Sequence, residues 1–348
     1  GGARPPPPPP PPPPFQPCPR QPHPMNPTMK NRNLHTIAGT ALAVLVSAVA
    51  LPAATLLHEF TFNDPANGTS TTSSGTLGGS ALMTNYVETG SSSRVSADLH
   101  SATGLGVSGK AGDYALNNTA ATRMGGSGAV NGDNAGYGGA AILANGAASL
   151  NGVNSFTISG WYNTASGAAP GNYARLIEIG SAGVWFQTGA GLQLSASIGG
   201  SSGARLASSD TRLFQANTWT FFAFTYDGDT GLVSLYAGSK ASGQLELISS
   251  DTLVNKGVVS TVTTQELSIG NTVGNNQQRP FQGLLDNFRI WGETTGSGGA
   301  LTQQQLQQIM TTDITGQAIP EPSATAAVAA LGALLLSAAF ALRRRRQA

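Results

Sequence analysis

A succession of short apolar or alternating segments, separated by glycine-rich turns, constrains the fold of this chain more than any other feature. Residues 219–226 (WTFFAFTY) are apolar on both faces, which predicts a central strand buried on both sides. The turn DGDTG at residues 227–231 then reverses the chain into residues 232–236, which predicts a hairpin. At least nine strands are expected, at intervals of about ten to fifteen residues, a spacing typical of an antiparallel sandwich or jelly roll.

The other strands are predicted from alternating apolar and polar residues bounded by turn residues. They are expected at residues 57–62, 113–117, 137–143, 156–162, 175–180, 184–187, 191–198, 245–248, 266–269 and 283–291. Between residues 69 and 108, serine, threonine and glycine dominate the sequence. This composition predicts long loops with only one or two short strands.

One helix is expected at the end of this strand-rich region. Thr302 and Gln305 have the spacing of a capping box, in which each side chain bonds the backbone N–H of the other residue. Leu301 and Leu306 are placed as a hydrophobic staple across this start, and Leu306 begins an apolar stripe. We therefore expect a short helix packed on the sandwich.

The N-terminal region contains the three parts of a secretory signal. A basic start at residues 30–32 precedes the apolar residues 37–51, and small residues follow as a cleavage zone. We interpret residues 25–54 as a signal peptide that begins at Met25 or Met29, with a signal anchor as the alternative. The protein is therefore expected to be exported.

A proline-rich stretch precedes this signal. Residues 1–24 include a run of prolines, which predicts polyproline or disordered chain, and we interpret them as upstream sequence translated by mistake. The only cysteine, Cys18, lies within this stretch. The mature chain is therefore expected to use neither disulfides nor thiol chemistry.

The mature chain is acidic, although the whole sequence is almost neutral. The sequence holds 18 Lys and Arg and 17 Asp and Glu. Eight of the bases lie in the two end segments, four in each, which leaves ten bases against seventeen acids and a charge of about −7. Phosphate binding needs clustered lysine and arginine, so this charge argues against nucleic acid and anionic lipid as partners.

The C-terminal residues have three parts in a specific order. Residues 324–342 carry no charge and, at about 1.5 Å per residue, could just cross a hydrocarbon core of roughly 30 Å as a helix. Four arginines at residues 343–346 follow, which predicts that the rest of the chain lies across the membrane from them. With Pro320, Glu321 and Pro322 in front, this end resembles the PEP-CTERM sorting signal of Gram-negative bacteria.

This resemblance implies a processing step. Residues 313–322 would be a linker that carries the sorting motif, and residues 323–348 a transmembrane sorting tail. The implied partner is an exosortase-type membrane transpeptidase that cuts near the motif. The protein would be anchored in the inner membrane before processing and would then reach the cell surface or extracellular matrix. A permanent C-terminal anchor is the alternative.

Five segments carry a second resemblance, in order and at plausible spacing. They are residues 155–161, 219–228, 267–271, 281–291 and the helix start at 301–302. Together they resemble the LamG-like module of the concanavalin A-like lectin and glucanase superfamily. The resemblance covers residues 55–312 and is weak before residue 110. It implies an all-β jelly-roll sandwich of two antiparallel sheets with one short C-terminal helix, whose concave face and edge loops bind carbohydrate, protein or calcium in relatives.

Catalytic groups are sparse in this sequence. Glycoside hydrolysis needs two carboxylates held a few ångströms apart, and the Glu-x-Asp-x-x-Glu run of the glucanase branch does not occur here. Glu178 stands alone in its predicted strand and is expected to be solvated. His58 and His100 are expected at the surface rather than as a base or zinc ligands. No catalytic residue is therefore predicted.

Calcium is the one cofactor that the acidic residues suggest. Asp227 and Asp229 lie in one tight turn, where clustered oxygen ligands suit calcium, although the same sequence is ordinary hairpin chemistry. Asp286 matches an acidic position frequent in the family that the chain resembles, where a capping role for nearby backbone is the alternative to metal ligation. The metal site is therefore left unassigned.

Tryptophan offers a platform for sugar binding, because an aromatic face complements a pyranose ring. Phe156 and Ile158 share one face of their predicted strand, and Trp161 occupies the other. Trp161 is therefore the candidate for sugar stacking on the concave face. The other tryptophans are expected in the core, namely Trp185, Trp219 and Trp291.

These features favour an exported, non-catalytic module that binds carbohydrate or has a structural role at the cell surface or in an exopolysaccharide matrix. Extracellular polysaccharide and the exosortase are the expected partners. Two alternatives stay open, a polysaccharide-degrading enzyme with an unrecognised site and a protein-binding adhesin.

Overall fold

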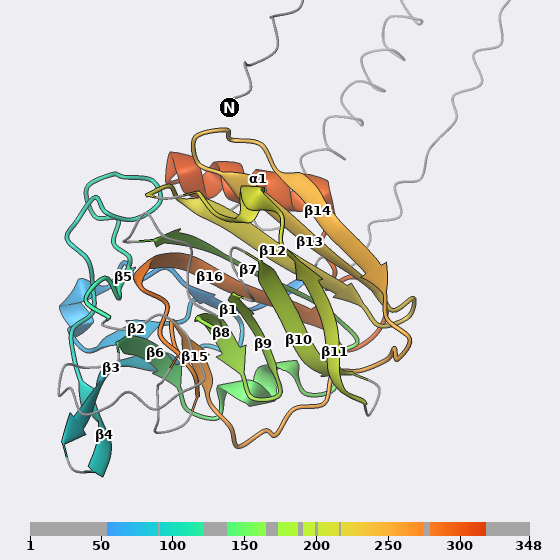
Figure 1. Cartoon of the computed structure of the whole chain (residues 1–348), viewed down its shortest axis with the longest axis horizontal. Helices are drawn as coiled ribbons and strands as arrows, with labels where there is room; N and C mark the ends of the chain where they lie inside the picture. Colours follow the sequence, from blue (N-terminus) through green and yellow to red (C-terminus); the bar gives the residue numbers. More distant parts are fainter. Residues whose placement is uncertain are drawn as a thin grey trace, which may run out of the picture. The chain divides into compact units, whose positions relative to one another are not determined.

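Two antiparallel β-sheets and one α-helix form the part of the chain that the computed structural model describes (Figure 1). The described residues are 54–89, 91–121, 138–164, 173–186, 191–198, 201–215, 217–273 and 279–317. The predicted all-β sandwich with a short helix is confirmed. Apart from Ala54, the predicted signal peptide, sorting motif and transmembrane tail fall outside these ranges. No helix within the ranges is long and apolar enough to cross a membrane.

The first sheet has seven strands in the order β1-β16-β7-β12-β13-β14, with β5 paired to β16. Its strands are β1 (Thr55–Phe60), β5 (Leu116–Asn117), β7 (Ser155–Thr164), β12 (Thr220–Asp227), β13 (Leu232–Ser239), β14 (Glu246–Thr252) and β16 (Gly283–Glu293). The predicted central strand is β12, which pairs with β7 on one side and with its hairpin partner β13 on the other. It is buried along both faces, as its sequence predicts.

The second sheet has nine strands in the order β11-β10-β9-β8-β15-β6-β3-β2, with β4 paired to β3. Its strands are β2 (Ser70–Thr72), β3 (Ser80–Thr89), β4 (Ser91–Ser96), β6 (Gly139–Leu143), β8 (Arg175–Ile179), β9 (Ala182–Phe186), β10 (Leu192–Ile198), β11 (Ser201–Ser208) and β15 (Leu267–Ile269). Strands β8 to β11 follow one another along the chain and form an antiparallel meander, of which β8, β9 and β10 were predicted and β11 was not.

The main hydrophobic core lies between the two sheets. Phe222 and Phe224 of β12 contribute to it from the seven-stranded sheet, and Phe186 and Leu194 from the nine-stranded sheet. All four are almost completely buried. Removing a side chain of this size from water stabilises the fold by about 1.5–3 kcal/mol, so the alternating inward residues of each strand supply most of the driving force.

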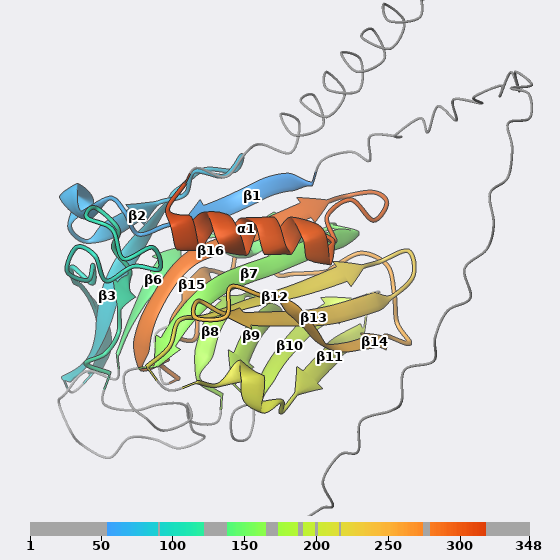
Figure 2. The same ribbon diagram turned by 90° about the horizontal axis from the view of Figure 1, so that it is seen from above.

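A second apolar layer lies on the outer face of the seven-stranded sheet. The helix α1 (Gln303–Thr315) runs across this face (Figure 2). Its Leu306 and Met310 belong to one buried cluster with Trp161 and Phe221 of the sheet. Because the helix covers them, residues that point away from the sandwich core are nevertheless buried.

The start of α1 confirms the predicted capping box. Thr302 Oγ1 accepts a hydrogen bond from the Gln305 N–H at 3.3 Å, and Gln305 Oε1 accepts from the Thr302 N–H at 2.8 Å. The helix runs to Thr315, so residues 313–315 belong to the domain and not to the predicted linker, because Asp313 is buried against the sheet. It ends at Gly316, whose φ of 58° lies in the left-handed region that glycine adopts without strain. Three short 3-10 helices lie in loops of the domain, η1 (Pro65–Asn67), η2 (Gly146–Leu150) and η3 (Thr211–Leu213).

The N-terminal part of the domain differs from the prediction. Instead of long loops with one or two short strands, residues 69–108 contain β2, β3 and β4, of which β3 is ten residues long. Ala81 and Met83 of β3 are buried in the core, and β3 pairs with β6 along one edge. Backbone ladder bonds hold such a strand without many large side chains, and for this reason its serine and threonine content concealed it.

Candidate functional site

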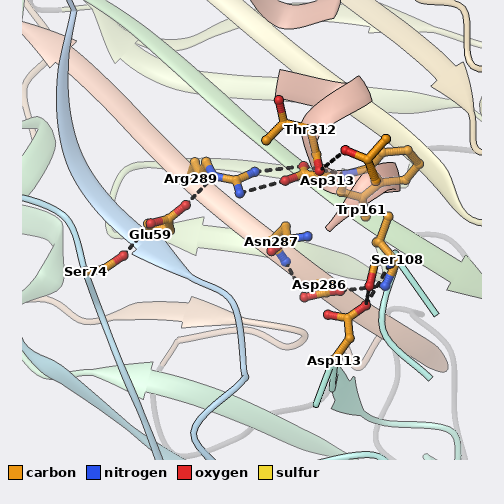
Figure 3. Close-up of polar contacts among 12 residues, drawn as sticks. Glu59, Ser74, Ser108, Asp113, Trp161, Asp286, Asn287, Arg289, Thr312 and Asp313 are labelled. Carbon is orange, nitrogen blue, oxygen red and sulfur yellow. Dashed lines mark hydrogen bonds and ion pairs between the residues drawn. The ribbon is translucent and has the colours of Figure 1, made fainter. Parts of the chain in front are cut away.

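Trp161, the residue predicted to stack on a sugar, is not accessible. It does lie on the face of β7 opposite to Phe156 and Ile158, but α1 covers that face and Trp161 is fully buried. Its indole Nε1 donates a hydrogen bond to Asp313 Oδ2 of α1 at 2.8 Å (Figure 3). The prediction was wrong because strand alternation identifies the face but not what covers it.

A buried ionic network surrounds this tryptophan contact. Arg289 of β16 donates from Nη1 and Nη2 to the two carboxylate oxygens of Asp313 at 2.8 and 2.7 Å, and from Nε to Glu59 Oε1 at 2.7 Å (Figure 3). Burial alone lowers the pKa of Arg289, but the charges of Asp313 and Glu59 outweigh it and raise the pKa. The network therefore ties α1 to β16 and β1 through a permanently charged guanidinium, which is a structural role.

Asp286 of β16 holds nearby backbone. Its Oδ2 accepts the Val107 N–H at 2.8 Å and its Oδ1 accepts the Asn287 N–H at 2.7 Å. Close by, Asp113 Oδ2 accepts from the N–H of Ser108 at 2.7 Å (Figure 3). Burial raises the pKa of Asp286 well above its ordinary value, and the charge of Asp113 adds to this. Asp286 therefore caps backbone N–H groups, which is the predicted alternative to metal ligation, and it organises the loop next to the end of α1.

The turn between β12 and β13 does not fit a calcium ion. Both carboxylate oxygens of Asp227 are used within the turn, accepting from the Asp229 N–H at 3.0 Å and from Thr230 Oγ1 at 2.8 Å. Lys256 Nζ donates to the Asp229 carbonyl at 2.8 Å, which places a positive charge where a cation would bind. Over all the described residues, no group of three or more His, Cys, Asp and Glu side chains is arranged to hold a metal.

The histidines are more enclosed than predicted. His58 is buried, with Nδ1 3.1 Å from Ser73 Oγ, and burial lowers the pKa of its imidazole. Only 3% of the His100 side chain is exposed, and its Nδ1 lies 2.8 Å from Asp98 Oδ1. The surface prediction was wrong for both. Residues 74–77 bond along β1 and Ser73 contacts the His58 ring, and strand periodicity reveals neither of these contacts.

Glu178 is also paired rather than solvated. The register of β8 is irregular between Arg175 and Ile177, which brings Arg175 to the face that Glu178 occupies. Glu178 Oε1 lies 3.6 Å from Arg175 Nε, and its Oε2 accepts the Val273 N–H at 2.9 Å. Only 16% of the Glu178 side chain is exposed. Regular alternation would place Leu176, two residues before Glu178, on the same face, so the prediction missed the arginine.

The outer face of the nine-stranded sheet carries side chains suited to ligand binding. Arg175 and Trp185 are cross-strand partners on β8 and β9, and the guanidinium carbon lies 4.2 Å from the centroid of the Trp185 ring. Trp185 points outward because its neighbours Val184 and Phe186 both lie in the core. At Gly183, an added Cβ would lie 2.9 Å from the Ile177 carbonyl oxygen, so the close approach of the β8 backbone requires a residue without a side chain beside Trp185.

A second pair of arginine and aromatic ring adjoins the first. The Arg279 guanidinium carbon lies 4.9 Å from the centroid of the Tyr173 ring. The Arg175 N–H donates to the Arg279 carbonyl at 3.0 Å, and Arg175 Nη1 donates to the Tyr173 carbonyl at 3.3 Å. Tyr173, Glu178, Trp185 and Arg279 are half-buried, whereas Arg175 is buried beneath them. We call these five residues the arginine–tryptophan patch.

Polar groups of the patch have unused bonding capacity. Burial lowers the pKa of Arg175, Glu178 opposes this effect, and the charge of Arg279 adds to it. Trp185 Nε1 and Ser268 Oγ are buried without a hydrogen-bond partner among the described residues. Ser268 is the cross-strand neighbour of Glu178 and therefore lies on the same face. An aromatic ring, a carboxylate and guanidinium groups together match the polar and apolar sides of a saccharide.

The patch contains one carboxylate. Two-carboxylate hydrolysis needs a second one held close to Glu178. Glu266, which directly precedes β15, is engaged by Arg94 through two bonds of 2.7 and 2.8 Å. This arrangement is that of an ion pair rather than of a free acid or nucleophile.

The sequence prediction missed most of this patch. Trp185 was predicted to lie in the core, but the alternation of Val184, Trp185 and Phe186 already places it on the other face from its two neighbours. Tyr173 and Arg279 were not singled out. No local signal identifies them, because they reach the patch from loops that are more than one hundred residues apart in sequence.

A comparison with protein families identifies the domain. The model of the concanavalin A-like lectin/glucanases superfamily matches residues 134–306, which include the strands from β6 to β16 and the first turn of α1. No curated protein matches the chain.

Several solved structures are similar to the chain. The botulinum neurotoxin serotype D/C binding domain has a TM-score of 0.46 at 10% identity, covering 74% of this chain and 52% of that one. The chain thus spans about half the length of that structure. Domain 4 of the extracellular arabinanase AbnA from Geobacillus stearothermophilus, in complex with arabinotriose, has a TM-score of 0.36 at 18% identity, covering 75% and 99%. The CBM40 of the Ruminococcus gnavus IT-sialidase, bound to sialyllactose, has a TM-score of 0.34 at 15% identity, covering 45% and 83%.

Proposed function

Because this chain carries a LamG-like domain of the concanavalin A-like lectin/glucanases superfamily, we propose that it is a non-catalytic module that binds extracellular polysaccharide. The observation that carries the proposal is the arginine–tryptophan patch on the outer face of the nine-stranded sheet. Trp185 presents an aromatic ring there, backed by the Arg175 guanidinium at 4.2 Å. A stacked ring with adjacent charged donors and acceptors is the arrangement by which proteins orient a sugar.

The non-catalytic part of the proposal rests on the state of the carboxylates. Glu178 faces Arg175 at 3.6 Å and also accepts a backbone N–H from Val273. Both carboxylate oxygens of Glu178 are thus engaged by the protein itself, whereas two-carboxylate hydrolysis needs a second carboxylate held close to the first. A polysaccharide-degrading enzyme remains the alternative, and it predicts that Glu178→Gln abolishes turnover of some polysaccharide.

Substitution of the patch tryptophan tests the binding function. Trp185→Ala should lower affinity for a polysaccharide ligand roughly tenfold or more, because stacking on an aromatic ring is lost together with its apolar contact. Affinity electrophoresis of the full chain through gels with and without each polysaccharide of a panel measures this effect. Tyr236→Ala is the matched control, since Tyr236 is a half-buried aromatic residue of β13 on the other sheet. Equal mobility of Trp185→Ala and wild type on every ligand would refute the proposed site.

The cellular location forms a separate part of the proposal. We infer that residues 25–54 direct export and that Pro320, Glu321 and Pro322 form the motif at which an exosortase-type transpeptidase acts. The support is the order of motif, uncharged residues 324–342 and terminal arginines in the sequence. The protein would then act at the cell surface or in the extracellular matrix, where polysaccharide is available.

A further inference from the structure

One arginine of the domain differs from the others in its electrostatic partner. Four of the described arginine side chains form ion pairs with carboxylates, namely Arg94, Arg175, Arg212 and Arg289. Arg279 has no carboxylate within ion-pair distance among the described residues. Its guanidinium lies instead over the Tyr173 ring, at 4.9 Å from the centroid. In a domain with more acids than bases, an arginine without a carboxylate partner is unexpected.

The backbone around Arg279 is fixed while its guanidinium is left available. The Arg279 N–H donates to Asn271 Oδ1 at 2.9 Å, and the Arg279 carbonyl accepts from the Arg175 N–H at 3.0 Å. Tyr173 has a φ of 68°, in the left-handed region that side-chain-bearing residues rarely adopt. Its ring is thus held under the guanidinium at a conformational cost. The result is a positioned cation, preorganised on a ring, whose guanidinium pairs with no carboxylate in the part of the chain that the structure describes.

We propose that the arginine–tryptophan patch selects anionic polysaccharide, with Arg279 bonding the carboxylate or sulfate of one sugar while Trp185 stacks on a sugar ring. This inference deepens the proposed function and rests on it. Guanidinium suits the role because its planar donors match the two oxygens of a carboxylate or sulfate. The Arg175 guanidinium beneath contributes further positive charge, and Glu178 neutralises only one of the two arginines.

The overall charge of the domain makes this selectivity testable. A domain of about −7 repels a polyanion at long range, so binding through nonspecific attraction is not expected. Binding must therefore depend on the local contact at Arg279. A variant that removes one positive charge elsewhere should not weaken the binding of a polyanion. Such a variant therefore separates local recognition from a change in net charge.

The experiment compares the full chain on two pairs of ligands that share a backbone. Polygalacturonate is paired with its methyl ester, and this comparison tests recognition of the carboxylate. Dextran sulfate is paired with dextran, and this comparison tests recognition of the sulfate. The variants are Arg279→Gln, Arg279→Lys and the control Arg212→Gln. Arg212 is exposed on η3 and paired with Asp210, and it carries the same charge as Arg279. Affinity is measured at two salt concentrations.

The wild type should bind at least one charged ligand roughly tenfold more tightly than its neutral counterpart. Arg279→Gln should remove that preference, Arg279→Lys should keep part of it, and Arg212→Gln should retain it in full. Equal binding of charged and neutral forms, or equal effects of Arg279→Gln and Arg212→Gln, would overturn the selectivity. The proposed function would stay intact in that case if Trp185→Ala still lowers the affinity for polysaccharide. Absence of binding to every polysaccharide would overturn both.

Discussion

Removal of Asp313 should test the ionic network that holds α1 on the sandwich. Arg289 makes three charge-assisted hydrogen bonds, and two of them end on Asp313. Asp313→Ala deletes both and also leaves the buried Trp161 Nε1 without its acceptor. Glu59 remains as a partner of the guanidinium, and its side chain is 17% exposed, which admits some solvent to that end.

The expected loss of stability follows from these contacts. Breaking a buried ion pair costs about 3–5 kcal/mol, because an uncompensated charge is left in the interior. The unpaired indole N–H adds about 1–3 kcal/mol, and the remaining pairing with Glu59 offsets part of the total. We therefore expect Asp313→Ala to lower the free energy of unfolding by about 3–5 kcal/mol. This is a large fraction of the 5–15 kcal/mol typical of a domain.

Urea unfolding of the full chain, followed by tryptophan fluorescence, measures the change. Asp251→Ala is the control, because Asp251 is an exposed carboxylate of β14 and its substitution removes the same charge. It should stay within about 0.5 kcal/mol of wild type. The double variant Arg289→Met with Asp313→Leu should be less destabilised than Asp313→Ala, since the charge left without its partner is then Glu59, whose side chain is 17% exposed, rather than the almost fully buried guanidinium. A loss below about 1 kcal/mol for Asp313→Ala, or a double variant that is no better, would refute the reasoning.

Two further predictions concern acid sensitivity and sorting. Burial alone raises the pKa of Glu59, but Arg289 and Ser74 outweigh it and hold the pKa below 4.5. The folded state therefore favours the charged carboxylate, and this stabilisation is present above the unfolded pKa and is lost as pH falls through the folded value. Glu59→Gln should lower the free energy of unfolding by about 1–3 kcal/mol at pH 7. In urea unfolding, the difference in this free energy between variant and wild type should shrink below about pH 4. A difference that does not change with pH would contradict the linkage. For the tail, Glu321→Ala in an exosortase-containing bacterium should leave the protein in the membrane fraction, whereas unchanged release would rule out the motif as the processing site.

Much of the architecture could be predicted from local sequence. The central strand β12, its hairpin with β13 and the capped helix α1 each depend on residues that are close in the chain. Residues 69–108 could not be predicted in this way, because β3 is stabilised by pairing with β6, whose partner residues lie 54 to 60 positions away. Strand pairing of this kind depends on the register between segments, which composition does not report.

The candidate site was harder to predict than the fold. Trp161 was chosen over Trp185, although alternation places both on the face opposite to core residues of their strands. The difference lies in what covers each face. The helix α1 packs over Trp161, whereas Trp185 lies half-buried on the outer face of its sheet. Arg279 could not have been selected, because its lack of a carboxylate partner is a property of the folded surroundings.

The sequence by itself determined the class of fold, since strand periodicity, turn residues and helix capping act within a few residues of one another. It also determined the acidity of the domain and the order of the C-terminal motif. The tertiary structure alone decided which outward faces are covered and which charges are paired. Both depend on contacts such as those of Arg289 with Glu59 and Asp313, which join residues from three separate elements. Periodicity records which side chains share a face, but burial and ion pairing are set by what the rest of the chain brings to that face.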